Sequence, residues 1–149
     1  MLVAETGRVT PAPDALHVEQ VGWGVARQVA RAVAARRDDP GGPPPLLADL
    51  VRLAETSGFL AYAVLDGREA LGVGLVSLPG VPGAADASAS YVGDVLVPGT
   101  DLPVRAAMVV RALHDAARAG CARLVVDEGP LEPDGTPWEA LGFQTLDAP

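Results

Sequence analysis

An acidic side chain interrupts an otherwise apolar segment of this sequence. Asp94 lies within YVGDVLV, which its β-branched and aromatic residues predict to be a strand. A partly buried carboxylate in such a strand can act as a general base toward an amine. Two other interpretations stay open. Asp94 either accepts a hydrogen bond from a neighbouring loop or faces water on the polar side of the strand.

The next segment, residues 95–120, predicts a strand end, a tight loop and a long amphipathic helix. The start of a helix offers unbonded N–H groups and about half a positive charge, which suits a phosphate. The loop here contains Asp101 and Pro103. Asp101 is a good helix N-cap, and its carboxylate would occupy the same amides and repel a phosphate. The junction is therefore either an anion site or a helix capped by its own chain.

Other reactive side chains form no motif. Cys121 begins the apolar segment CARLVV and is the single cysteine, so we expect a small buried residue and no internal disulfide. His17 starts a predicted strand and His114 lies on the polar face of the long helix, which gives no metal-ligand spacing. The sequence contains no serine elbow, P-loop or zinc pattern. No metal is expected.

Composition excludes several classes of partner. The chain of 149 residues has a formal net charge of −8, and its 11 basic residues are all arginine. An acidic chain with few aromatic residues is poorly suited to nucleic acid. No apolar run approaches the ~20 residues of a membrane span, and the opening residues do not resemble a signal peptide. We therefore expect no membrane partner and a cytoplasmic location.

Periodicity and turn residues predict the order β-β-α-α-β-β-β-α-β-α-β. Antiparallel hairpins followed by one β-α-β crossover predict an α/β fold with a mixed, mostly antiparallel sheet and helices on both faces. The apolar run at 121–128 is expected to be a strand buried on both faces. The Pro-rich residues 38–45 are expected to be a loop within a single domain, 1–149. The predicted strands are 1–9, 15–21, two around the DG turn in 59–78, 90–97, 121–128 and 143–146, and the helices are 23–37, 46–58, 103–119 and a short turn at 138–143.

The order of several short segments resembles the GCN5-related N-acetyltransferase superfamily, known as GNAT. The matching segments are LDGREALGVGLV, VLVP, DLPVRA, RALHDAARAG, RLVV and WEALGF, clearest between residues 59 and 143. The resemblance implies a GNAT-like fold and acetyl-CoA, or another acyl-CoA, as co-substrate. It also implies an N-acyltransferase that acts on a small-molecule amine.

The resemblance also implies which residues hold the cofactor. GNAT proteins bind the pyrophosphate with the loop R/Q-x-x-G-x-G/A, and Asp101, Val104 and Ala106 stand at its three named positions. Asp101 and Val104 depart from the pattern, and Arg105 could offset the acidic charge. The cofactor-binding residues implied by the resemblance are Val95, Leu96, Val97, Leu102, Val104, Arg105 and Ala106.

For the chemistry, the family places a backbone amide of the strand before the loop, here Val95 to Val97, on the thioester carbonyl. It often places an acidic base where Asp94 stands. The tyrosine that many relatives use to protonate the thiolate is replaced by Trp138, and the asparagine after the penultimate strand is missing. Tyr91 is the substitute acid we name, with ordinary strand packing as the alternative.

Two functions remain open at this stage. The first is an acyl-CoA-dependent N-acyltransferase. The second is a degenerate GNAT-fold protein that does not acetylate and serves instead as a binding, regulatory or dimerisation module, or performs chemistry without CoA. A homodimer is a further expectation. Relatives often pair through sheet edges or terminal strands, and the N-terminal strand could serve in this way.

Overall fold

The computed structural model describes residues 1–6, 16–36, 58–79, 88–98, 103–127, 131 and 135–145. The predicted second helix lies outside these residues up to position 57. Asp101 and Leu102 also lie outside them, as do the acidic residues near 38 and 130.

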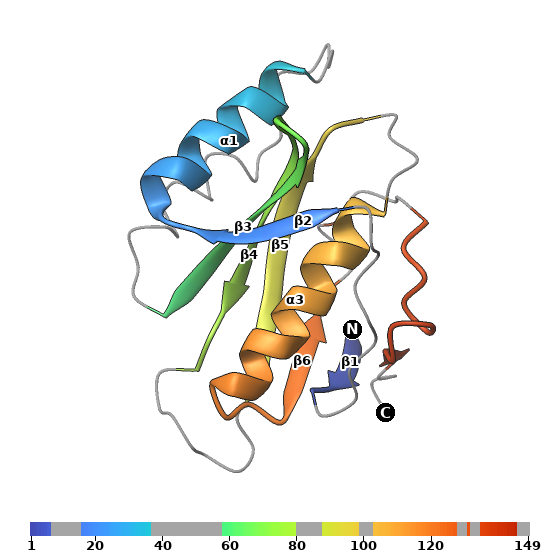
Figure 1. The fold of residues 1–149 in the computed structure, drawn as a ribbon. Helices are drawn as coiled ribbons and strands as arrows, with labels where there is room; N and C mark the ends of the chain where they lie inside the picture. The colour runs from blue at the N-terminus through green and yellow to red at the C-terminus, as the bar shows by residue number, and fades with distance from the viewer. Residues whose placement is uncertain are drawn as a thin grey trace.

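Seven strands form one sheet in the order β2-β3-β4-β5-β6-β1-β7 (Figure 1). Parallel pairing occurs between β5 and β6, and the other neighbouring strands pair antiparallel. The prediction of a mostly antiparallel sheet with one β-α-β crossover is therefore confirmed. The strands are β1 (Leu2–Glu5), β2 (His17–Val21), β3 (Phe59–Asp66), β4 (Glu69–Ser77), β5 (Ser88–Leu96), β6 (Arg123–Val126) and β7 (Gln144–Thr145).

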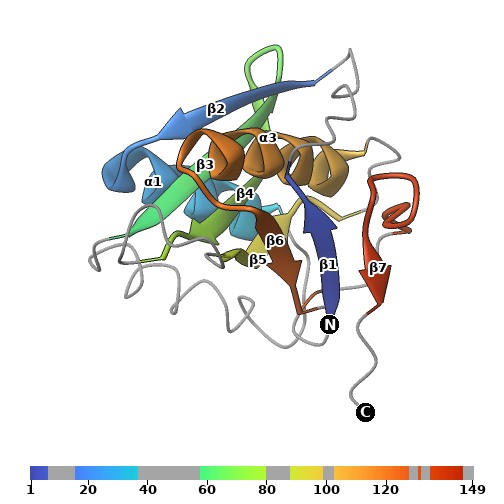
Figure 2. The same cartoon turned by 90° about the horizontal axis from the view of Figure 1, so that it is seen from below.

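Strand β1 lies inside the sheet, between β6 and β7 (Figure 2). Leu2 pairs with Val126 on one side and with Thr145 on the other. The buried side chains of Leu2 and Ala4 extend the apolar face to which β6 contributes. Pairing of two chains through the N-terminal strand stays a prediction.

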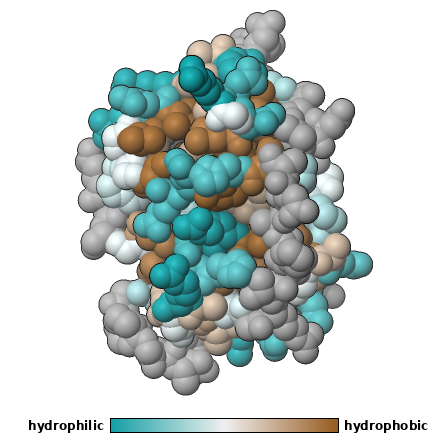
Figure 3. Space-filling model, viewed as in Figure 1, coloured by the Kyte–Doolittle hydropathy of each residue, from teal (hydrophilic) through white to brown (hydrophobic). Residues whose placement is uncertain are grey.

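Helices cover both faces of the sheet, as predicted. Side chains alternate between faces along each strand. On β3, Ala61 belongs to the apolar cluster under α1 (Trp23–Ala35), whereas Tyr62 belongs to the cluster under α3 (Val104–Arg118). Hydrophilic residues gather over α3 on the molecular face seen in Figure 3, so the helix is amphipathic. Among the described residues, no helix has the length and apolar character needed to cross a membrane.

Two local features differ in detail from expectation. Strand β6 alternates in burial, with Leu124 and Val126 buried, Val125 half-buried and Arg123 exposed. The expectation that this strand is buried on both faces is therefore wrong, because its second face is less covered. The β3–β4 hairpin forms as predicted, and its sharp turn is made by Gly67, whose φ is +62°.

Candidate active site

A β-bulge in β5 brings Tyr91 and Asp94 to the same face of the sheet. Tyr91 pairs with Val76 and Gly93 pairs with Leu75, so Val92 is an extra residue without a partner on β4. In a regular strand, residues three apart point to opposite faces. The extra residue removes that alternation, which is a known use of bulges beside functional sites. Both side chains consequently point toward α3.

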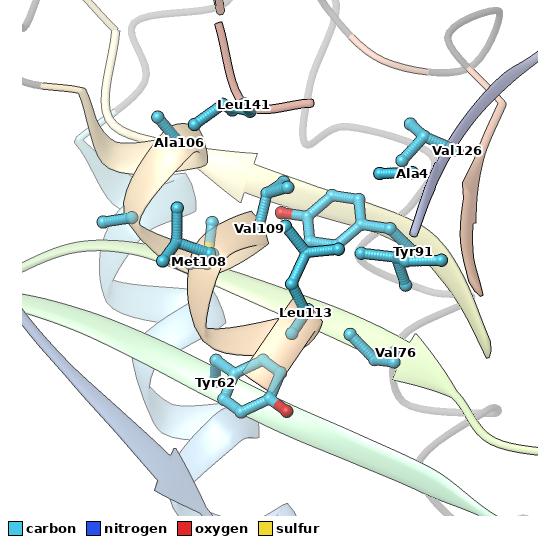
Figure 4. Packing of buried hydrophobic residues seen from close by; sticks show 14 of the residues in the cluster. Ala4, Tyr62, Val76, Tyr91, Ala106, Met108, Val109, Leu113, Val126 and Leu141 are labelled. Atoms are coloured by element: carbon cyan, nitrogen blue, oxygen red, sulfur yellow. The ribbon is translucent and has the colours of Figure 1, made fainter. Parts of the chain in front are cut away.

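Asp94 is held by a buried ion pair and by a phenol. The Arg105 Nε atom lies 2.7 Å from Asp94 Oδ2, and Arg105 Nη2 lies 2.8 Å from Oδ1. The Tyr91 hydroxyl donates to Oδ2 at 2.7 Å. The side chains of Arg105 and Asp94 are 3% and 2% exposed. Figure 4 shows the Tyr91 ring beneath α3, beside Val109. We call these three residues the β5–α3 cluster.

The geometry of this cluster differs from both structural alternatives that the sequence left open. Asp94 is buried away from water, and its partners lie on α3 and on its own strand rather than on a loop. Asp94 accepts hydrogen bonds at both oxygens, from Tyr91 and from the fork of Arg105. Tyr91, in turn, directs its proton to Asp94. The catalytic assignment of Asp94 and Tyr91 stays a prediction, and both residues have a clear structural task.

Two glycines on β4 let α3 approach the sheet closely. A Cβ atom at Gly72 would lie 2.9 Å from Val104 Cγ1, and one at Gly74 would lie 2.9 Å from Met108 Sδ and from the Tyr91 hydroxyl. Val104 stands where the GNAT loop has its first glycine, and its side chain is buried against the sheet. The missing side chain at Gly72 makes room for the Val104 side chain between α3 and β4.

Strands β5 and β6 part beside the first turn of α3. Their parallel pairing ends at Tyr91 and Val126, whereas β5 continues to Leu96. The Val97 amide donates to the Leu71 oxygen on β4 at 2.9 Å. Because backbone groups alternate in direction along a strand, the amides of Asp94 and Leu96 point away from β4, toward the side of β5 on which β6 pairs with Ser88–Tyr91.

The first turn of α3 begins at Val104. Pro103 is the N-cap residue and provides no side-chain cap. The first bond within the helix joins the Ala107 amide to the Pro103 oxygen, so the amides of Val104 and Ala106 precede the helical hydrogen-bond ladder. The Arg105 side chain turns into the core toward Asp94. The role of Arg105 in offsetting the charge of Asp101 stays a prediction, because Asp101 lies outside the described residues.

Solved structures share this arrangement of strands and helices. The aminoglycoside N-acetyltransferase AAC(6')-Iy in complex with CoA matches with a TM-score of 0.60 at 15% identity, over 94% of this chain and 95% of that chain. A GCN5-related N-acetyltransferase from Kribbella flavida matches with a TM-score of 0.63 at 16% identity, over 96% of this chain and 52% of that chain. An acetyltransferase from Trypanosoma brucei matches with a TM-score of 0.59 at 12% identity, over 90% of this chain and 96% of that chain.

This chain has the GNAT fold. No family model matches the sequence, and no curated protein matches it. The similarity to these structures therefore lies in the backbone and in the order of the elements. The resemblance seen in the sequence also rested on the order of its segments.

A second cluster fixes the middle of α3 to the GNAT sheet, which we call the β3–α3 cluster. The Tyr62 hydroxyl donates to Asp115 Oδ2 at 2.7 Å, and Arg111 Nε donates to the same oxygen at 3.1 Å. Arg111 Nη1 also donates to the Val18 oxygen of the edge strand β2 at 3.2 Å. Burial and, secondarily, the bond to Asp115 raise the pKa of Tyr62. The expected i, i+4 neighbours Arg111 and Asp115 do form an ion pair.

The remaining candidates lie away from the opened strands of the GNAT sheet. Trp138, which stands at the position of the family's tyrosine, packs edge-on against Phe143 at 5.2 Å between ring centroids. A shallow hollow of about 500 Å³ beside these rings runs along β1 and β7, separated from β5 by β6 and β1. Cys121 is buried, as predicted, and burial raises the pKa of its thiol. His114 is exposed on α3.

Sequence reasoning missed how these groups combine. It named Asp94, Tyr91 and Arg105, but assigned Arg105 to the phosphate and the other two to proton transfer. What it did not predict is the bulge at Val92, which places Tyr91 and Asp94 on the same face of β5. The sequence signal for it is weak: Gly93 within a strand, a residue that often accompanies a bulge.

Proposed function

We propose that this protein transfers an acyl group from an acyl-CoA to an amine. The observation that supports it is the end of β5, which extends beyond its ladder with β6 and is joined to the first turn of α3 in a GNAT fold. Amides at a helix start suit a diphosphate, and backbone amides of a strand suit a thioester carbonyl. In this proposal the diphosphate binds near Leu102 and the amides of Val104, Arg105 and Ala106.

The thioester is proposed to bind along the end of β5. The proposed donors are backbone amides of Val95–Val97, where β5 extends beyond its ladder with β6. An amide positioned where negative charge develops on the carbonyl oxygen stabilises the transition state. Because this contact uses the backbone, it does not depend on the side chains that differ from the family pattern.

A small-molecule amine is the proposed acceptor. Among the similar structures, one is AAC(6')-Iy in complex with the bisubstrate analogue CoA-S-monomethyl-acetylneamine, and another is an aminoglycoside acetyltransferase in complex with sisomicin. Those ligands are amines. The first structure has a TM-score of 0.58 at 17% identity, so its chemistry supports the proposal through the fold.

Packing accommodates one of the departures from the family pattern. Val104 replaces a glycine of the family loop, but its side chain packs into the space left by Gly72. The substitution is therefore absorbed inside the protein. The second function, a GNAT-fold module that does not acetylate, rests on Asp101 and on the missing tyrosine and asparagine.

Ligand-dependent thermal unfolding separates the two functions. Acetyl-CoA at a hundred times its dissociation constant should stabilise the fold by about 2.7 kcal/mol, which raises the Tm by several degrees. ADP, which shares the diphosphate but lacks the thioester arm, is the matched control and should give a smaller shift. Release of CoA in the presence of a panel of amines then tests transfer. An unchanged Tm at millimolar acetyl-CoA would contradict the proposal and support the non-acetylating module.

A further inference from the structure

We propose that the β5–α3 cluster, Tyr91, Asp94 and Arg105, is a positioning device for acyl-CoA. This inference rests on the proposed function and deepens it. The three side chains fix the first turn of α3 against the bulge in β5. Those two elements carry the amides proposed for the diphosphate and for the thioester. The cluster thereby sets the distance between the two ends of the cofactor's binding site.

The placement of Arg105 supports this role. A cation in the first turn of a helix opposes the helix dipole, and a buried cation needs a partner. Arg105 is both in the first turn and almost fully buried, yet its two nitrogens reach both oxygens of Asp94. A bidentate pair of this kind fixes orientation as well as distance. Its partner carboxylate is in turn oriented by Tyr91.

The bulge in β5 connects the cluster to the backbone of that strand. Asp94 reaches Arg105 because Val92 is extra in β5, which turns Asp94 toward α3. The same bulge lies where β5 leaves β6. If Asp94 lost its partners, the bulge and the direction of the Leu96 amide would no longer be fixed. The residues of the cluster act through the backbone, so we class them as positioning residues.

The β3–α3 cluster is a matched control within the same helix. It contains the same three residue types, with Tyr62 and Arg111 both bonded to one carboxylate oxygen of Asp115. It ties α3 to β3 and β2, on the other side of β4 from the opened strands. Substitutions in this cluster test the loss of a phenol–carboxylate–guanidinium contact without a change at the proposed site.

The experiment compares Tyr91→Phe and Asp94→Asn with Tyr62→Phe and Asp115→Asn. Acetyl-CoA affinity is measured by calorimetry, kcat and KM by CoA release, and the mobility of the first turn of α3 by hydrogen exchange. We expect the dissociation constant and the KM for acetyl-CoA to rise about tenfold in the β5–α3 variants, and by less than about twofold in the controls. Exchange at the Ala107 and Met108 amides should quicken in the β5–α3 variants alone. Tyr91→Phe serves where Asp94→Asn does not fold.

Each outcome has one meaning. A wild-type protein that binds acetyl-CoA, with equal losses in the two sets of variants, overturns the positioning role and leaves the proposed function intact. A loss of kcat with unchanged KM, together with loss of the acidic limb of the pH–rate profile in Asp94→Asn, also overturns it, because those are the signs of a general base. A wild-type protein that binds no acyl-CoA overturns the proposed function itself, and this inference with it.

Discussion

At the scale of single residues, phenol and carboxylate side chains form the hydrogen bonds that join α3 to the sheet. Tyr62 is fully buried, and its hydroxyl donates to Asp115. Burial favours the neutral phenol, so the folded protein resists ionisation of this group. The pKa of Tyr62 is therefore higher in the folded state than in the unfolded chain.

This difference predicts a loss of stability in alkali. The contribution of Tyr62 to the free energy of unfolding is complete below the unfolded-state pKa of about 10. Above that pH, the Tyr62 phenol ionises in the unfolded chain but stays neutral in the folded protein. The free energy of unfolding should then fall by about 1.4 kcal/mol per pH unit more steeply in the wild-type protein than in Tyr62→Phe. Urea unfolding of both proteins at several pH values between about 9 and 11 measures the difference. Parallel curves would show that the Tyr62 phenol ionises equally well in both states.

Residue types in the sequence identified part of the site. The polarity of Asp94 inside an apolar strand marked it as unusual, and this is visible without a structure. Its partner was not visible, because Arg105 lies on a predicted helix whose register allows its side chain to turn toward solvent or toward the core. The choice depends on a carboxylate eleven positions away and on the bulge that turns it.

At the scale of elements, the contact of α3 with β4 depends on two glycines. A Cβ atom at Gly72 would meet Val104, Leu96 and the Val95 carbonyl oxygen at 2.9 to 3.2 Å. Val104 is β-branched and the carbonyl belongs to the backbone, so neither yields easily. At Gly74 the close neighbours are the ends of side chains, Met108 Sδ and the Tyr91 hydroxyl, which can shift more readily.

Gly72→Ala should therefore lower the free energy of unfolding by about 1–3 kcal/mol through overpacking. Gly24→Ala is the control: Gly24 lies in α1, and a Cβ atom there has no neighbour within 4 Å. That change should stabilise the protein by about 0.5 kcal/mol, because alanine loses less backbone entropy on folding. Urea unfolding of the three proteins provides the comparison. Equal changes in the free energy of unfolding for the two substitutions would mean that Val104 does not lie close enough to Gly72 to exclude a methyl group.

Helix positions were predicted closely, and strand positions less so. The apolar stripes of α1 and α3 have a period that only a helix satisfies, and Gly67 marks the hairpin turn. Strand ends have no comparable signal. Residues 1–9 alternate weakly, and β1 is shorter than that, Leu2–Glu5. Nothing in its pattern specifies β6 and β7 as neighbours, because an alternating strand fits beside many others.

At the scale of the whole molecule, Cys121 is a natural probe of global unfolding. It is the single cysteine in the sequence and is 3% exposed, in the apolar cluster under α3. Its amide donates to the Ala116 oxygen at 2.9 Å, so the residue is fixed at the end of the helix. Access to its sulfur requires separation of α3 from β6.

Labelling of Cys121 by a thiol reagent should accordingly follow the unfolding equilibrium. Native protein should react at least about a thousandfold more slowly than urea-unfolded protein, and a loss of 1.4 kcal/mol in stability should speed labelling about tenfold. Gly72→Ala and Gly24→Ala should shift the rate in opposite directions. Rapid labelling of all three native proteins at one common rate would point to a local opening at the C-terminal end of α3.

The position of β1 has a consequence for the order of assembly. Its partners, β6 and β7, are encoded near the other end of the printed sequence. During synthesis, Leu2–Glu5 leaves the ribosome before β6 and β7 have been made. Until then its apolar side chains are exposed to solvent or bound by a chaperone. Strands β2 to β6 pair in the order in which they occur along the chain, whereas the ladders of β1 join segments far apart in the sequence, and such contacts form slowly. We expect the late, rate-limiting event of folding to be this final insertion.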